Sequence, residues 1–189
     1  YVVRDRWSGV STSAGIGDVQ IGLSREFSAG SERAASLLGF AQWRTATGDI
    51  DRNPPTGFGQ QAITFGVATV KRQDPVVLFG SLSYTAGIGS AQLRDGARLR
   101  AGNVFGGRLG AYLAATPETS LYSGLTFNSN ADDRFDGRRI DGSSRLSGVL
   151  ELGSTTVIGR GRFLNISAGI GFTPAAPKFT LTLSSPLRF

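Results

Sequence analysis

The sequence predicts an all-β fold of antiparallel strands, and three observations support this. Apolar and polar residues alternate, as in Phe179, Leu181 and Leu183 against Thr180 and Thr182, which is the period of a strand with one apolar face. Glycine makes up 27 of the 189 residues and charged residues only 18%, against averages of about 7% and about 25%. No apolar run approaches the roughly 18 residues of a transmembrane helix, so a membrane protein of this composition would span with strands.

The alternation predicts strands in order along the chain. They cover 1–7, 18–27, 34–44, 60–72, 75–87, 103–115, 120–129, 145–152, 163–172 and 178–189. The segment 34–44 also fits a helical stripe, but we interpret it as a strand. Most of these segments have roughly 9 to 13 residues, which suits a tilted strand that crosses a bilayer. Strands of soluble sandwiches are nearer to about 5 or 6 residues.

The connections between the predicted strands alternate in length. Short turns lie at 28–32, 72–74, 116–118 and 159–162, and longer polar loops lie at 8–17, 46–59, 87–98 and 130–142, with a shorter one at 173–177. Short turns at one rim and long loops at the other are typical of outer-membrane barrels. The sequence therefore predicts one domain, residues 1–189, folded as an antiparallel transmembrane up-and-down β-barrel of about ten strands, or alternatively twelve, with short periplasmic turns and long extracellular loops.

Aromatic residues near the strand ends favour the same interpretation. Those near the long loops are Trp7, Trp43, Tyr84, Phe127 and Phe172, and those near the short turns are Phe27, Phe163 and Phe189. Membrane barrels carry aromatic girdles at both interfaces. The alternative is that aromatic residues are simply common in strands, which predicts scatter rather than two bands.

The polar side of the predicted strands supplies candidate residues of a barrel lumen. They are Glu26, Arg108, Tyr112, Tyr122, Asn128, Glu151 and Asn165. Glu26 and Glu151 are also candidates for a catalytic dyad, but pairing with arginine is favoured because an uncompensated buried charge is costly. The chain has no His and no Cys, which removes Ser-His-Asp and Cys-His catalysis and the usual zinc sites. We therefore expect no enzyme activity, catalytic residues or cofactor.

The long loops carry clustered carboxylates and isolated aromatic residues. The carboxylates are Asp49, Asp51, Asp132, Asp133 and Asp136. Clustered oxygens suit calcium, but the EF-hand spacing is absent, so solvated carboxylates are favoured and no metal is expected. Phe58 and Phe135 either contact a partner or fold back over the barrel mouth. The net charge is +6, but the basic residues are scattered or paired with acids, so no nucleic-acid partner is expected.

A short motif, 13–17, recurs at 85–89 and 167–171. No helix is predicted after any copy, which excludes a nucleotide-binding loop. In the two later copies the Ala and Ile residues continue the apolar face, and the glycines thin the inner one. In the first copy Ile16 is out of phase with Val19 and Ile21, which predicts a bulge or turn at Gly17 and Asp18.

Three segments of the chain carry a family resemblance. They are 15–18, 74–84 and 171–189, and the order of segments over essentially the whole chain resembles the outer-membrane barrels grouped as transporters of the meta-pathway-of-phenol-degradation type. The resemblance implies a Gram-negative outer membrane and passage of small, aromatic or hydrophobic molecules. The terminal Phe189 is similar to the signal by which the barrel-assembly machinery recognises its clients.

These observations together predict a narrow channel or transporter, because small barrels have lumens largely occupied by side chains. Its selectivity is expected to depend on the lumen residues. The alternative is a non-transporting barrel that anchors or assembles with a surface or periplasmic partner. The expected partners are membrane lipid and lipopolysaccharide, the barrel-assembly machinery, and further copies of the chain or a surface partner.

Overall fold

The computed structural model describes residues 2–5, 9–12, 14–31, 33–51, 53–93, 96–158 and 162–185. Within these ranges the regular structure consists of strands, and all strand pairs are antiparallel. The same ranges hold no helix that is long and apolar enough to cross a membrane. The predicted all-β antiparallel class is confirmed.

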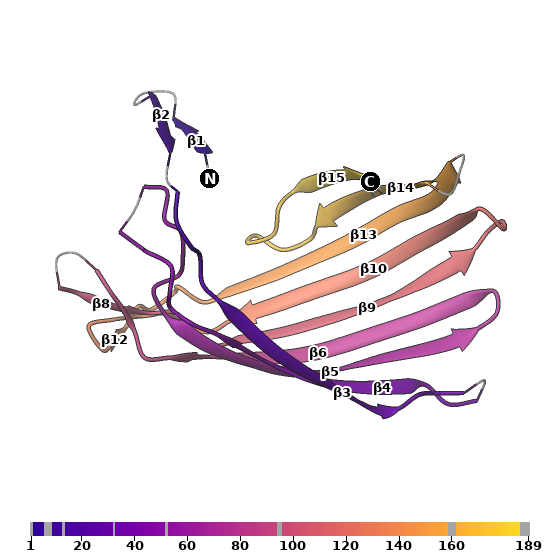
Figure 1. Cartoon of the computed structure of the whole chain (residues 1–189), viewed down its shortest axis with the longest axis horizontal. Coiled ribbons are helices and arrows are strands. Elements are labelled where there is room, and N and C mark those ends of the chain that lie inside the picture. Colours follow the sequence, from indigo (N-terminus) through magenta and orange to yellow (C-terminus); the bar gives the residue numbers. More distant parts are fainter. Residues whose placement is uncertain are drawn as a thin grey trace.

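The largest sheet has nine strands in the order β15-β14-β13-β10-β9-β6-β5-β4-β3. Their bounds are β3 Gln20–Ser28, β4 Ser36–Arg44, β5 Gln61–Gln73, β6 Val76–Ile88, β9 Val104–Ala114, β10 Thr119–Asn130, β13 Arg145–Ile158, β14 Arg162–Gly171 and β15 Phe179–Ser184. The segment 34–44, ambiguous in sequence, forms strand β4 from Ser36 to Arg44. Successive strands of this sheet are neighbours, so the short turns gather at one end and the long loops at the other (Figure 1).

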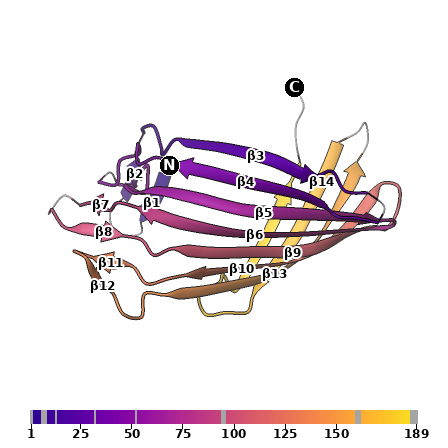
Figure 2. The ribbon, with the colours of Figure 1, turned by 90° about the horizontal axis from the view of Figure 1, so that it is seen from below.

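Two smaller sheets lie outside the large one. β1 (Val2–Asp5) pairs with β2 (Gly9–Thr12). A four-stranded sheet of order β12-β11-β8-β7 is built from long-loop segments: β7 Ala91–Gln92, β8 Arg98–Arg100, β11 Arg134–Phe135 and β12 Arg138–Arg139. This loop sheet extends beyond the long-loop ends of the main strands (Figure 2).

The large sheet is open in the described residues, whereas the sequence predicted a closed barrel of about ten strands. β3 pairs only with β4, and β15 only with β14. Of the predicted first strand, 1–7, the described residues Val2–Asp5 form β1, which pairs with the adjacent β2 and not with the large sheet. A local hairpin closes at a lower entropic cost than a long-range pairing. Closure, and a count of ten or twelve strands, therefore stay predictions. The expected assembly signal Phe189 lies outside the described residues.

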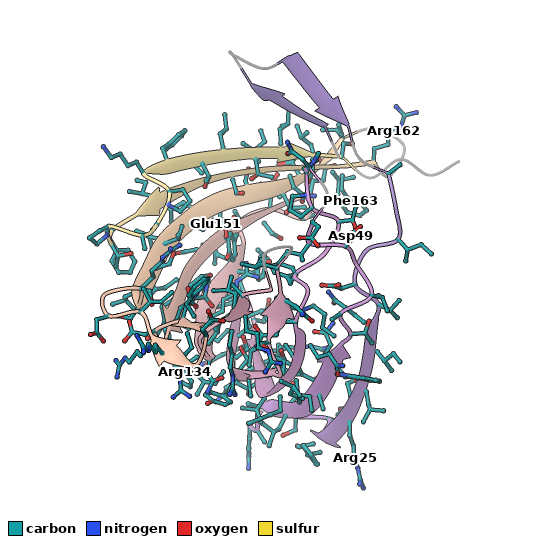
Figure 3. All side chains as sticks on the ribbon, turned by 90° about the vertical axis from the view of Figure 1, so that its left-hand side faces the viewer. Arg25, Asp49, Arg134, Glu151, Arg162 and Phe163 are labelled. Carbon is teal, nitrogen blue, oxygen red and sulfur yellow. The ribbon has the colours of Figure 1, made fainter. Side chains whose placement is uncertain are left out.

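The sheet is curved, which gives it an inner and an outer face. Viewed from the long-loop rim, Glu151 lies on the inner side of the curve and Arg25 points away from it (Figure 3). Residues paired across antiparallel strands share a face. Glu151 is in register with Gly124, which pairs with Gly110, and Gly110 pairs with Phe79. The inner face can therefore be followed from strand to strand.

The outer face is apolar and uncovered. Its exposed side chains include Leu23 at 74%, Leu109 at 53%, Val67 at 45% and Leu183 at 69%. Among the described residues, the buried hydrophobic side chains are only Ala62 and Ala91. The apolar side of the alternation is therefore a surface rather than a protein core, and a continuous apolar surface of this kind requires a non-aqueous or protein partner.

Aromatic rings lie over glycines of the same or a neighbouring strand on both faces. On the outer face Phe27 covers Gly39, Phe127 covers Gly107 and Phe172 covers Gly148; on the inner face Phe40 covers Gly66 and Phe79 covers Gly110. A Cβ atom added at any of these glycines would collide with the ring. These glycines thus leave the space in which aromatic rings pack closely against the backbone.

The predicted aromatic bands are found in large part. Trp43, Tyr84, Phe127 and Phe172 lie on the outer face toward the long loops, and Phe27 lies on it toward the short turns. Phe163 lies near the short turns, as predicted, but it does not belong to the aromatic band of the outer face. It pairs with Val157 and lies on the inner side (Figure 3), because its position in the alternation is opposite to that of Leu164 and Ile166. Trp7 is outside the described residues.

The recurring motif has the predicted alternation in its two later copies. Ile88 and Ile170 lie on the outer face, while Gly87 and Gly169 lie on the inner one. The first copy differs from the prediction of a bulge or turn. Residues 14–19 precede the sheet, and β3 begins at Gln20. Ile16 is out of phase because it is not in a strand.

Candidate functional site on the inner face

Five adjacent strands bring a group of polar and aromatic residues together on the inner face. β6 supplies Phe79, β9 supplies Arg108 and Tyr112, β10 supplies Tyr122, β13 supplies Glu151 and β14 supplies Ser167. We call these residues the inner-wall cluster. Its members share one face because they stand at alternate positions on strands in register.

Hydrogen bonds connect the polar members of the cluster in a chain. Arg108 Nη2 donates to the Tyr122 hydroxyl at 2.6 Å, and this hydroxyl donates to Glu151 Oε2 at 3.2 Å. Ser167 Oγ donates to Glu151 Oε1 at 2.9 Å. Both carboxylate oxygens of Glu151 therefore have a partner, and the tyrosine hydroxyl bridges the cation and the anion.

Arg108 and Glu151 also form an ion pair, with 3.7 Å between Arg108 Nη2 and Glu151 Oε2. Their side chains are 47% and 32% exposed, respectively. Charges that remain this accessible to solvent attract each other only weakly. The pair therefore keeps charged groups available on the inner wall instead of burying them.

The aromatic members stack beside this polar chain. The ring centroids of Tyr112 and Tyr122 are 5.0 Å apart, those of Phe79 and Tyr112 are 5.5 Å apart, and those of Phe79 and Tyr122 are 6.0 Å apart. The Arg108 guanidinium lies 5.5 Å from the Phe79 ring centroid and 5.7 Å from that of Tyr122. These distances suit attractive aromatic and cation–π contacts. The cluster thus offers apolar faces, a hydroxyl and both signs of charge.

The other predicted lumen residues share the inner face but form no hydrogen bond with the cluster among the contacts of the described residues. Asn165 accepts a hydrogen bond from Thr155 Oγ1 at 2.7 Å and donates one to Ser184 Oγ at 3.4 Å. Asn128 pairs with Gly106 and Ser147 on the side of the long loops. Glu26 is on β3 at one edge, and β10, β9, β6, β5 and β4 lie between it and the strand of Glu151. The described sheet thus does not bring the two glutamates of the hypothetical dyad together.

A second interaction centre, Asp18, holds the long loop 45–60. Its Oδ1 accepts the Gly48 N–H and its Oδ2 accepts the Phe58 N–H, each at 2.9 Å. The Arg44 guanidinium lies 4.2 Å from the Phe58 ring centroid, and Arg44 Nε lies 4.0 Å from Asp18 Oδ2. The Phe58 ring therefore packs against Arg44 at the end of β4, although Phe58 remains 65% exposed.

The other loop carboxylates bind backbone and arginine groups. Asp133 accepts the Gly102 N–H and Asp136 accepts the Arg98 N–H, each at 2.8 Å. Asp132 accepts the Ser144 N–H at 2.6 Å and forms an ion pair with Arg139, and its bond to Arg139, followed by that to Ser144, lowers its pKa from the ordinary value. Within the described part of the chain, no group of three or more metal-ligating acidic residues was found.

The sequence pattern identified most of the cluster but missed some members. Phe79 was assigned only to a strand, and Ser167 was placed on the inward side of the recurring motif but was not named as a lumen candidate. Alternation could also have placed Phe79 on the inner face, since it is two residues from Val77 and Ser81. The strand register is needed to group both residues with Tyr122 and Glu151. Asp18 could not be found from alternation, because it lies before β3.

Comparison with known proteins places this fold. No protein-family model matches the chain. Among solved structures, the chain is similar to the crystal structure of the COG4313 outer membrane channel from Pseudomonas putida F1, with a TM-score of 0.75 and 17% sequence identity over 94% of this chain and 67% of that chain. At this identity the similarity concerns the fold. The curved antiparallel sheet is therefore an arrangement that this chain shares with an outer membrane channel.

Proposed function

We propose that the nine-stranded sheet forms part of the wall of a narrow outer-membrane channel for small molecules. The observation that carries this proposal is the separation of its two faces: an exposed apolar face outside and the inner-wall cluster inside. An apolar surface toward lipid with a polar lumen is the arrangement of transmembrane barrels. The fold shared with an outer membrane channel supports the same function.

The composition of the inner-wall cluster suggests the class of solute. Tyr112, Tyr122 and Phe79 present aromatic rings, and Arg108 and Glu151 present opposite charges. Aromatic surfaces with a few placed polar groups recognise small organic molecules. We propose small aromatic or otherwise hydrophobic solutes with a polar substituent, in line with the resemblance to transporters of the phenol-degradation type. Membrane lipid, lipopolysaccharide and the barrel-assembly machinery are the proposed partners, and transport rather than catalysis is the proposed activity.

Conductance measurements in planar bilayers test the proposal. Glu151→Gln removes the negative charge of the cluster and leaves Arg108 unbalanced, so permeability to anions relative to cations is expected to rise. Arg108→Gln is expected to shift selectivity in the opposite direction. Glu118→Gln is the matched control, because it makes the same charge change on an exposed turn outside the sheet wall. Liposome swelling with small aromatic acids measures solute passage in parallel.

Protein that inserts into bilayers but gives neither conductance nor solute flux would reject the channel. It would favour the non-transporting anchor instead, since the apolar outer face would then serve membrane attachment alone. Equal selectivity shifts in Glu151→Gln and Glu118→Gln would retain a channel but remove the inner-wall cluster from its selectivity.

A further inference from the structure

The small loop sheet carries an unusual arrangement of arginines. Arg100 of β8 is directly opposite Arg134 of β11, which is directly opposite Arg139 of β12. Arg98 lies two residues from Arg100 and so shares their face. Like charges directly opposite each other across strands are destabilising. We call Arg98, Arg100, Arg134 and Arg139 the arginine face.

Neighbouring acids balance only part of the arginine face. Arg139 forms an ion pair with Asp132, and its Nε lies 3.9 Å from Asp141 Oδ1. Arg100 Nη2 donates to the Gly87 carbonyl at 3.1 Å, which does not neutralise its charge. The side chains of Arg98 and Arg134 have no ion pair or hydrogen bond among the contacts found between described residues.

The unbalanced arginines surround a cavity. It has a volume of about 580 Å³ and is lined by Gly89, Ser90, Arg98, Arg100, Arg134, Asp136 and Gly137. Asp136 contributes the acidic group of this lining, and its Oδ1 accepts the Arg98 N–H at 2.8 Å. The hairpin that carries Arg134 is closed by Asp136 and Gly137, both with positive φ (47° and 79°). Arg134 lies at the long-loop rim, facing the viewer in Figure 3.

We propose that the cavity of the arginine face binds a phosphate-bearing anion at the long-loop rim. Guanidinium groups bind phosphate through paired, charge-assisted hydrogen bonds. A bound phosphate also removes the repulsion between Arg100 and Arg134, so binding and stability of the loop sheet are coupled. The anion is either soluble or the headgroup of a phosphorylated lipid. This site is separate from the inner-wall cluster and does not depend on transport.

Calorimetric titration tests the site on the full chain in detergent, with inorganic phosphate as one probe. Diphosphorylated lipid A dissolved in the same detergent is the second probe, with lipid-free detergent as the blank of the titration. Arg134→Gln is expected to weaken binding about tenfold, and Arg98→Gln gives a second test of the same cavity. Arg138→Gln is the matched control. It stands on the same hairpin but pairs with Phe135, on the opposite face of the loop sheet.

The two probes distinguish the sources of the anion. Binding of free phosphate that Arg134→Gln weakens and Arg138→Gln leaves within twofold supports a soluble-anion site. Binding confined to lipid A in detergent, with the same order of variants, supports a lipid headgroup. Absence of binding in both experiments, or equal losses in Arg134→Gln and Arg138→Gln, overturns the proposal. Circular dichroism of each variant confirms that the strands are intact.

Discussion

The two faces of the same nine strands are built by different means. The inner face satisfies its polar groups with one another, as in the bonds from Arg108 to Tyr122 and from Tyr122 to Glu151. The outer face exposes aliphatic side chains and sets rings over glycines, as Phe127 covers Gly107. Because adjacent residues alternate between these faces, each strand presents a polar and an apolar surface at once. The comparison predicts that the same substitution has different energetic costs at neighbouring positions.

The largest difference is expected for a charge placed at the middle of β5. Val67 is on the outer face and 45% exposed, and Ala68 follows it on the inner face. Val67→Arg is expected to lower the free energy of unfolding by about 2–4 kcal/mol, since a cation then meets the hydrocarbon. Ala68→Arg is expected to cost distinctly less. Reversible denaturant titration in lipid vesicles measures both, and equal costs would show that the outer face does not lie in lipid.

A smaller effect is expected from adding a side chain to a glycine that an aromatic ring covers. Gly107→Ala places a Cβ atom against the Phe127 ring, which must move. We expect a loss of about 1–3 kcal/mol, as for other overpacked sites. Gly80→Ala is the control on the same face, because its added Cβ would meet Thr69 Cγ2 at 3.6 Å and the Arg108 carbonyl oxygen at 3.7 Å, which are ordinary contacts. Equal stability of the two variants in the same titration would show that Gly107 is not needed for the packing of the Phe127 ring.

The smallest effect concerns Asp132, in a loop beyond both faces. Its bonds to Arg139 and to the Ser144 N–H lower its pKa below the ordinary 3.8. A lowered folded pKa means that the stabilisation is fully present above the unfolded pKa and is lost as pH falls through the folded value. Hydrogen exchange at the Ser144 amide, corrected for its intrinsic pH dependence, is therefore expected to lose protection below about pH 4. Asp132→Asn should lack this transition, and an unchanged profile in that variant would contradict the assignment.

Local pattern was sufficient for much of the fold and for the face of each lumen candidate. Period-two alternation placed Glu151, Tyr122 and Arg108 on one face, because the apolar residues of each of these strands all lie on the opposite, outer face. It could not predict that β1 pairs with β2, since the residues of β2 were assigned to the long loop 8–17. It also could not reveal the arginine face. Arg100 and Arg134 are far apart in sequence, and only the register of β8 and β11 sets them opposite each other.

The free edges of the large sheet have a consequence for the protein's assembly. In the described residues, β3 and β15 each leave one row of backbone N–H and C=O groups without a strand partner. Water can solvate such a row, but hydrocarbon cannot, and each unsatisfied group in lipid costs several kcal/mol. Nine strands with two bare edges therefore cannot by themselves form a closed wall in hydrocarbon. In a bilayer these edges require partners, from further strands or from another chain, before the inner face can enclose a lumen.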